Sequence, residues 1–157
     1  MKTLTPLHSN VVTPQSGCSY PEPFKTRMGD GSWRALGDAF ELTQFGINLE
    51  TLKPGAESAL RHWHTLEDEF VYVLSGEVLL RTNDGDFPLS AGMCMGFKAG
   101  SDNAHHLLNR SEQAAQYLIM GSRIAGDLAF YPDDNLIWSF FAEGRVAAHK
   151  DGTPYPD

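Results

Sequence analysis

The sequence predicts a single all-β domain, built as a sandwich or barrel of short strands. Between residues 40 and 123, apolar segments of strand length recur, and several are rich in β-branched and aromatic residues. Gly, Pro, Asn or Asp separates most of these segments, as expected for strands joined by turns. At 157 residues the chain is long enough for one well-packed domain and too short for two. The expected strands cover residues 40–52, 58–64, 69–74, 77–82, 87–90, 93–97, 105–109 and 115–123.

The segment that precedes these strands, residues 1–35, is predicted to be an extended N-terminal arm. It holds four prolines and shows neither a helical nor a strand period. Tyr20, Phe24 and Trp33 offer apolar side chains that would anchor the arm against the domain. We therefore expect the arm to pack over the barrel rather than to remain a free tail.

The barrel is expected to span residues 36–125, followed by a C-terminal extension at residues 126–157. A hairpin turn is predicted at residues 83–85, because the sequence Asn-Asp-Gly adopts positive φ at little cost. In the extension, residues 136–141 (LIWSFF) are too apolar to be left exposed to water. We expect them to pack on one mouth of the barrel or on a second subunit.

The composition argues against several classes of partner. A formal net charge of -8 and the absence of any run of Lys or Arg argue against nucleic-acid binding. No apolar stretch is long enough to cross a bilayer. The N-terminus lacks the apolar core of a signal peptide, so a cytoplasmic location is expected. In that compartment Cys18 and Cys94 are expected to be free thiols.

Three histidines and one glutamate offer a full set of ligands for a metal ion. His62 and His64 are two residues apart, so on a strand their rings point to the same face. Glu69 opens the apolar segment FVYVL, where an inward carboxylate would be costly without a cation. His105 would complete the set from another strand. These ligand types predict one divalent ion: iron, manganese, zinc or nickel.

The two segments that hold these ligands resemble the two motifs of the cupin superfamily. The matching positions are Gly55, His62, His64, Glu69 and Gly76 in the first motif, and Gly92, Gly100, His105 and Asn109 in the second. The sequence of residues 61–77 (RHWHTLEDEFVYVLSGE) is similar to that of small single-domain bacterial cupins. The resemblance implies a double-stranded β-helix, or jelly-roll, barrel, and it also implies a homodimer.

Neighbouring residues leave alternatives for two of the ligands. His105 keeps the family's interval to Asn109 and is preferred over His106. Strand alternation places His106 on the opposite face, where it either packs between layers or orients a ligand. Glu67 and Asp68 are assigned to solvent, because Glu69 is the acid at the start of the apolar strand.

The resemblance implies three hypotheses for function. The first is a dioxygenase-type enzyme, and the second is a Lewis-acid isomerase or lyase with His106 as a weak candidate base. The third is a binding protein for a sugar or an organic acid that performs no chemistry. In each case the partner is a small polar molecule, for which Gln44 and Asn48 are candidate hydrogen-bonding residues on one strand face.

Overall fold

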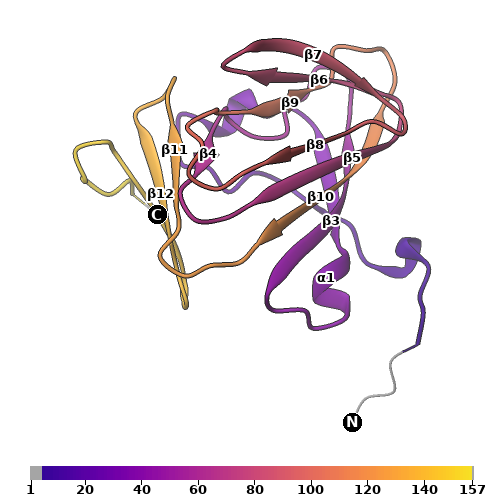
Figure 1. Ribbon diagram of the computed structural model, residues 1–157, viewed down its shortest axis with the longest axis horizontal. Coiled ribbons are helices and arrows are strands. Elements are labelled where there is room, and N and C mark those ends of the chain that lie inside the picture. Colours follow the sequence, from indigo (N-terminus) through magenta and orange to yellow (C-terminus); the bar gives the residue numbers. More distant parts are fainter. Residues whose placement is uncertain (1–4, 157) are drawn as a thin grey trace.

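A computed structural model describes residues 5–156 and shows an almost entirely β architecture (Figure 1). Residues 1–4 and 157, at the ends of the expected arm and extension, lie outside the described residues. Within the described range, thirteen strands form three antiparallel sheets, which confirms the all-β prediction. No helix in that range combines the length and the apolar character needed to cross a membrane.

The largest sheet has six strands, in the order β1-β2-β3-β10-β5-β8. The first two strands of this order, β1 and β2, come from the segment expected to be an arm, and β2 pairs with β3 while β1 forms the edge of the sheet. Short helical turns η1 (Ser9–Val11) and η2 (Lys25–Arg27) and the helix α1 (Leu36–Ala39) connect this region. The strands are β1 (Gln15–Ser16), β2 (Gly31–Ala35), β3 (Phe45–Leu52), β10 (Ala115–Ser122), β5 (Glu69–Ser75) and β8 (Cys94–Phe97).

Two smaller sheets complete the molecule. One contains β7 (Gly85–Ser90), β6 (Glu77–Thr82) and β9 (His106–Leu108). The other contains β13 (Gly144–Ala148), β12 (Leu136–Phe141), β11 (Leu128–Tyr131) and β4 (Trp63–His64). Three strands of this last sheet come from the C-terminal extension, and β11 pairs directly with β4. The extension therefore lies beside the histidine motif.

Glycines close two of the turns that position these strands. Thr82 pairs with Gly85 across the β6–β7 hairpin, which confirms the turn predicted there, and Gly85 has a φ of 127°. Gly76, between β5 and β6, has a φ of 73°. A Cβ at this position would lie 2.9 Å from the backbone oxygen of Ala114, so a larger residue would have to displace the backbone of β10.

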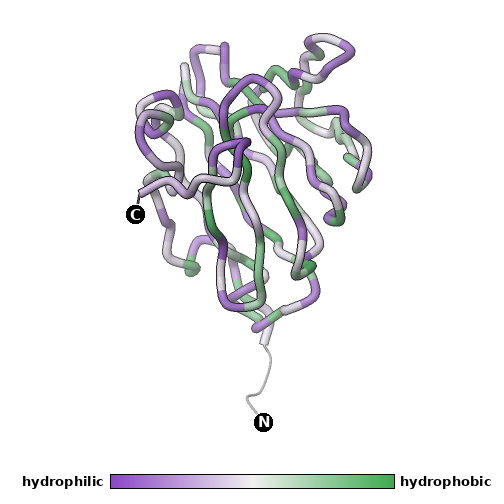
Figure 2. Tube along the Cα trace, turned by 90° about the vertical axis from the view of Figure 1, so that its left-hand side faces the viewer, coloured by the Kyte–Doolittle hydropathy of each residue, from purple (hydrophilic) through white to green (hydrophobic). Residues whose placement is uncertain are grey.

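The alternating pattern of each strand produces two apolar cores. The first lies between the six-stranded and three-stranded sheets and includes Val71, Val73, Leu80 and Tyr117. The second packs the four-stranded sheet against the N-terminal segment, and includes Phe24, Leu60, Tyr131, Leu136 and Trp138. In Figure 2 hydrophobic colour follows the strands, and hydrophilic colour gathers at many of the turns. Leu136 and Trp138 of the apolar segment at residues 136–141 are thus covered within the chain itself, whereas Phe141 is 56% exposed.

Candidate metal centre

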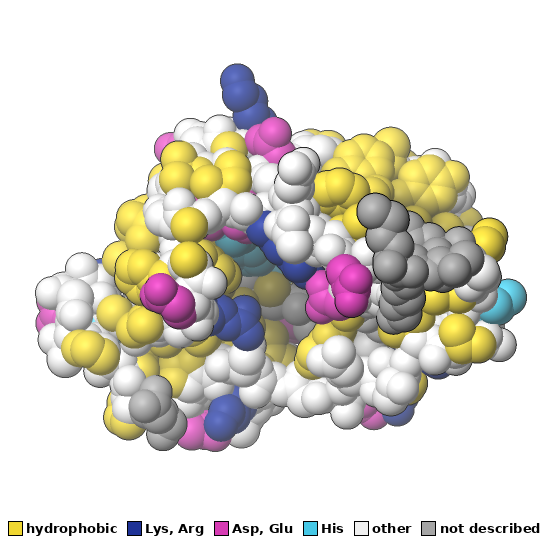
Figure 3. All heavy atoms as spheres, turned by 90° about the horizontal axis from the view of Figure 1, so that it is seen from below, with side chains coloured by type: hydrophobic (Ala, Val, Ile, Leu, Met, Phe, Trp, Pro, Cys, Tyr) yellow, Lys and Arg dark blue, Asp and Glu magenta, His cyan; other side chains and the backbone are white. Residues whose placement is uncertain are grey.

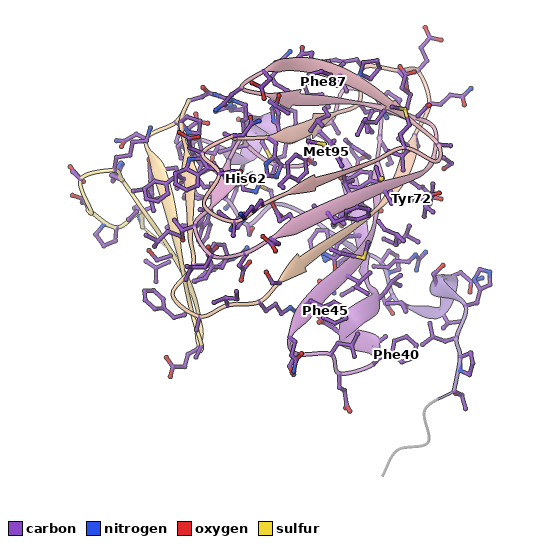
Figure 4. All side chains as sticks on the ribbon, viewed as in Figure 1. Phe40, Phe45, His62, Tyr72, Phe87 and Met95 are labelled. Atoms are coloured by element: carbon purple, nitrogen blue, oxygen red, sulfur yellow. The ribbon has the colours of Figure 1, made fainter. Side chains whose placement is uncertain are left out.

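Three imidazole rings converge on one carboxylate oxygen inside the molecule. Glu69 Oε2 lies 2.9 Å from His105 Nε2 and 3.8 Å from Nε2 of both His62 and His64. Glu69 is the first residue of β5, and His62 is joined to His105 by a pair of backbone hydrogen bonds. Figure 4 shows His62 among the strands of the barrel, whereas Tyr72 lies on the outer side of β5. The structure therefore brings together the four residues that the sequence predicted to be ligands.

Hydrogen bonds at the other ring nitrogen orient each of these histidines. Nδ1 of His62 lies 2.7 Å from the carbonyl oxygen of Leu60, and Nδ1 of His105 lies 3.4 Å from that of Asn103. A ring that donates its Nδ1 proton to a carbonyl keeps a lone pair at Nε2. Nε2 of His62 therefore keeps its lone pair for a cation, whereas Nε2 of His105 donates a hydrogen bond to Glu69 Oε2, a proton that a bound cation would displace.

Asp127 holds the third ring and was missed in the sequence. Its Oδ2 lies 2.5 Å from Nδ1 of His64, while Oδ1 accepts hydrogen bonds from Thr65 and from the backbone N–H of Leu66. The Asp127 side chain is fully buried. A carboxylate behind a ligating histidine fixes the ring and increases its basicity. Nothing in the local sequence signals this role, because Asp127 lies 63 residues from His64.

Burial and charge set the protonation of the centre. Burial, which disfavours a positive imidazole, lowers the pKa of His62 to about 4. Burial opposes ionisation of Glu69, but the hydrogen bond from His105 and the neighbouring rings outweigh it and hold the pKa of Glu69 at about 2. At neutral pH the centre therefore presents a neutral His62 and an ionised Glu69, the forms that bind a divalent cation.

A second cluster of possible metal ligands lies beside the cluster of His62, Glu69 and His105. Ligand atoms of His64, Glu67 and Asp127 lie within 4.8 Å of one another, as do those of His62, Glu69 and His105. In the second group Asp127 already accepts three protein hydrogen bonds, and Glu67 accepts one of 2.6 Å from the N–H of Ile124. In the first group the only hydrogen bond between ligand atoms, among the described residues, joins Nε2 of His105 to Glu69 Oε2, so this group is the better donor set for a metal. Glu67, expected in solvent, is half-buried beside it.

The convergent rings line a cavity of about 450 Å³. Figure 3 looks onto a hollowed face of the molecule, where histidine atoms lie behind basic side chains. A neighbouring cavity of about 380 Å³ extends under the N-terminal segment, along Cys18 and Trp33. The two cavities share seven lining residues: Tyr20, Asn48, Glu50, Ser58, Tyr131, Phe140 and Arg145.

The remaining sequence candidates occupy different environments. Asn48 lies in the wall of both cavities. Gln44 is exposed just before β3 begins and is not among the residues that line the cavity, so the structure does not bring it to the site. His106 also borders the cavity, but its Nδ1 lies 2.8 Å from the carbonyl oxygen of Ala59 and 3.8 Å from Glu57. Its ring is thus engaged apart from the three converging histidines.

Glu50 is a second residue that the sequence reasoning missed. It follows Asn48 by two residues on β3, so the alternation that selected Asn48 also selects Glu50. Burial raises the pKa of its carboxyl to about 7, and the hydrogen bond from Asn48 only partly offsets the effect. A carboxyl with such a pKa in a cavity is a candidate for proton transfer.

Comparisons with known proteins identify the relatives of this chain. A family model described as "Cupin domain" matches residues 48–121. The crystal structure of a sugar phosphate isomerase of the cupin superfamily from Silicibacter pomeroyi is 37% identical, covers 97% of each chain and has a TM-score of 0.92. A protein from Acidithiobacillus ferrooxidans, provisionally named a sugar phosphate isomerase, is 28% identical over 82% of this chain and 81% of its own, with a TM-score of 0.73.

More distant similarity extends to other activities. A predicted oxalate decarboxylase from Thermotoga maritima is 22% identical, covers 75% of this chain and 98% of its own, and has a TM-score of 0.61. At that identity the likeness shows the fold alone. No curated protein matches the sequence.

Proposed function

This chain belongs to the cupin superfamily, and from that membership and the site geometry we propose that it is a metal-dependent isomerase of a small phosphorylated sugar. The observation that carries the proposal is the convergence of three Nε2 atoms on Glu69 Oε2 in the wall of a cavity of about 450 Å³. The substrate class comes from the Silicibacter pomeroyi relative, which is similar over 97% of each chain.

In this proposal His62, His64, Glu69 and His105 hold one divalent ion, either iron, manganese, zinc or nickel. The Nε2 lone pairs of His62 and His64 and the ionised Glu69 carboxylate fit such an ion, and His105 would release its Nε2 proton on binding it. When bound, it supplies Lewis acidity that polarises a substrate carbonyl. Asp127 keeps His64 in the tautomer that leaves Nε2 free.

Other cavity residues would position the substrate. Arg145 lines both cavities and lies 4.8 Å from the centre of the Trp138 ring, so its guanidinium is held beside the opening. A guanidinium in this position would bind a phosphate by paired hydrogen bonds. Burial raises the pKa of Tyr20 to about 12, and its hydroxyl lies 3.2 Å from that of Tyr131. Both hydroxyls therefore remain protonated at neutral pH and can donate to sugar oxygens.

The test uses the full chain, stripped of metal and then reloaded separately with manganese, iron, zinc and nickel. A panel of aldose and ketose phosphates is followed by NMR for conversion of one isomer into the other. We expect metal-dependent isomerisation of at least one compound, and its loss in His62→Ala. Oxygen uptake without isomerisation would instead support the dioxygenase hypothesis. Thermal stabilisation by a sugar phosphate that stays unchanged would support the binding protein.

We also propose a homodimer, formed through the outer face of the six-stranded sheet. Phe70, Tyr72 and Leu74 alternate outward along β5 and are 37%, 38% and 44% exposed. On the adjacent β10, Leu118 and Met120 pair with Tyr72 and Phe70 and extend the same apolar face. A continuous apolar sheet face of this kind is typical of a protein–protein contact, and a second copy is the partner that the family membership favours.

The thiols fit the location expected from the sequence. Cys18 and Cys94 are both free, and Cys94 is exposed. Exposed free thiols persist in a reducing compartment. We therefore propose a cytoplasmic location.

A further inference from the structure

Glu50 occupies the part of the wall that the two cavities share. It lies on β3, where the register places it opposite Trp33 of β2 on one side and Tyr117 of β10 on the other. Its carboxyl borders both the cavity of the histidine cluster and the cavity beneath the N-terminal segment. A molecule that fills the first cavity and reaches toward the second would pass this carboxyl.

The surroundings of Glu50 are polar but carry no compensating charge. Asn48 Nδ2 donates to Glu50 Oε1 over a long 3.4 Å. Among the residues that the structure describes, no basic side chain forms an ion pair with this carboxyl. The neighbouring Tyr117 is buried, and Ser58 Oγ, in the wall of the same cavity, accepts the N–H of Leu107. A partly buried acid whose charge is not compensated costs free energy, and such a cost is commonly retained where the group has a chemical task.

We propose that Glu50 is the acid–base residue that carries a proton between two adjacent carbons of the substrate. The inference rests on the proposed function, an isomerase of a phosphorylated sugar. It adds a catalytic residue that lies outside the metal centre, on a different strand from each of the four ligands.

The proton transfer balances without any further reactant. The Glu50 carboxylate removes the proton from the carbon beside the carbonyl, and the electron pair of that C–H bond forms a carbon–carbon double bond as the carbonyl oxygen becomes negative. The proton of the adjacent hydroxyl passes to that oxygen. The protonated Glu50 then returns its proton to the former carbonyl carbon, and a new carbonyl forms at the neighbouring position. Glu50 ends in its starting state.

The protonation state of Glu50 suits both halves of this transfer. Because burial raises its pKa to about 7, the acid and the carboxylate are both populated at neutral pH. The facing strand contributes Tyr117, whose own pKa burial raises further, so this neighbour stays uncharged. The other titratable or charged side chains around the two cavities are Cys18, Tyr20, Glu57, His62, His64, Glu67, Glu69, His105, His106, Arg123, Tyr131 and Arg145.

The experiment measures deuterium uptake from D₂O into the carbon-bound positions of the sugar phosphate, together with turnover, on metal-loaded full-length protein. The variants are Glu50→Gln, which removes the carboxylate but keeps the shape, and Glu50→Asp, which keeps the carboxylate. Glu77→Gln serves as the matched control, because Glu77 is an exposed acid at the start of β6. Metal content and melting temperature are recorded for each protein.

We expect Glu50→Gln to lose about 10²- to 10⁴-fold in kcat and to lose deuterium exchange, with metal content and KM little changed. Glu50→Asp should recover part of the rate, and Glu77→Gln should match the unmodified protein. In the unmodified protein kcat should rise with pH through about 7, and the residual rate of Glu50→Gln should lack that rise.

Two outcomes would overturn the inference, and they differ in what else they remove. If Glu50→Gln still exchanges deuterium at the full rate while the unmodified protein is active, Glu50 is not the proton carrier and the proposed function stands. If the unmodified protein isomerises none of the sugar phosphates with any metal, the proposed function falls and takes this inference with it.

Discussion

Replacing Glu50 by Gln should raise the free energy of unfolding, but only at pH values above about 4.5, the pKa of the carboxyl in the unfolded chain. In the folded protein the pKa of Glu50 is raised from 4.5 to about 7 by burial. Below pH 4.5 the carboxyl is protonated in both the folded and the unfolded chain, so it costs nothing. As the pH rises from 4.5 to 7 the unfolded chain releases its proton first, which favours unfolding. Above pH 7 the cost is complete, and Gln, which cannot ionise, avoids it.

The size of the effect follows from the same pKa. Each unit between the folded and unfolded pKa corresponds to about 1.4 kcal/mol, so the full cost of the Glu50 carboxylate is about 3 kcal/mol. For a domain of this length that amounts to roughly 6 to 12 °C in melting temperature. Gln preserves the volume of the side chain and its hydrogen bond with Asn48, so no cavity offsets the gain.

The assay is urea unfolding of metal-free protein at a series of pH values between 4 and 8, for Glu50→Gln and the unmodified chain. Metal-free protein is used so that metal affinity, which itself depends on pH, does not enter the comparison. The protonation of His62 is common to both proteins and cancels in their difference. A stability difference that is the same at pH 4 and pH 8, or one that favours Glu at pH 8, would refute the reasoning.

Three further predictions concern the metal centre and the dimer. His105→Ala should abolish stoichiometric metal binding while His106→Ala retains one equivalent by elemental analysis; full occupancy in His105→Ala would exclude it as a ligand. Asp127→Asn should weaken metal affinity about 10- to 100-fold in a competition titration, because the ring of His64 loses its carboxylate partner, and an unchanged affinity would contradict that role. Tyr72→Lys should convert the proposed dimer into a monomer in light scattering, and a dimer that persists would place the contact elsewhere.

Local sequence was sufficient where a feature depends on residues next to one another. The strand predicted at residues 77–82 coincides with β6, and the turn after it lies where Asn-Asp-Gly predicted it. The segment at residues 58–64 behaved differently, because only Trp63 and His64 form a strand. There the backbone pairs only through isolated bridges, such as His62 with His105, and Ser58 Oγ accepts the N–H of Leu107, a side-chain contact that no local pattern predicts.

The four converging residues were predictable for a related reason. The spacing of His62 and His64 puts their rings on one strand face by the geometry of the backbone alone. Glu69 stood out because it begins an apolar strand, and that strand is β5 in the structure. What the sequence did not contain is the order of pairing that places β5, β4 and the His62–His105 bridge around a common point.

The sequence by itself thus determined the β class, most strand positions and which residue types face inward, since strand alternation and turn chemistry are local properties. Only the tertiary structure decided that Asp127 lies behind His64, that the C-terminal strands pair with the histidine strand, and that Glu50 is partly buried with no ion-pair partner among the described residues. These facts depend on which distant segments pack together. The packing of distant segments is determined by apolar burial and hydrogen bonding summed over the whole chain, so it cannot be predicted from a short stretch of sequence.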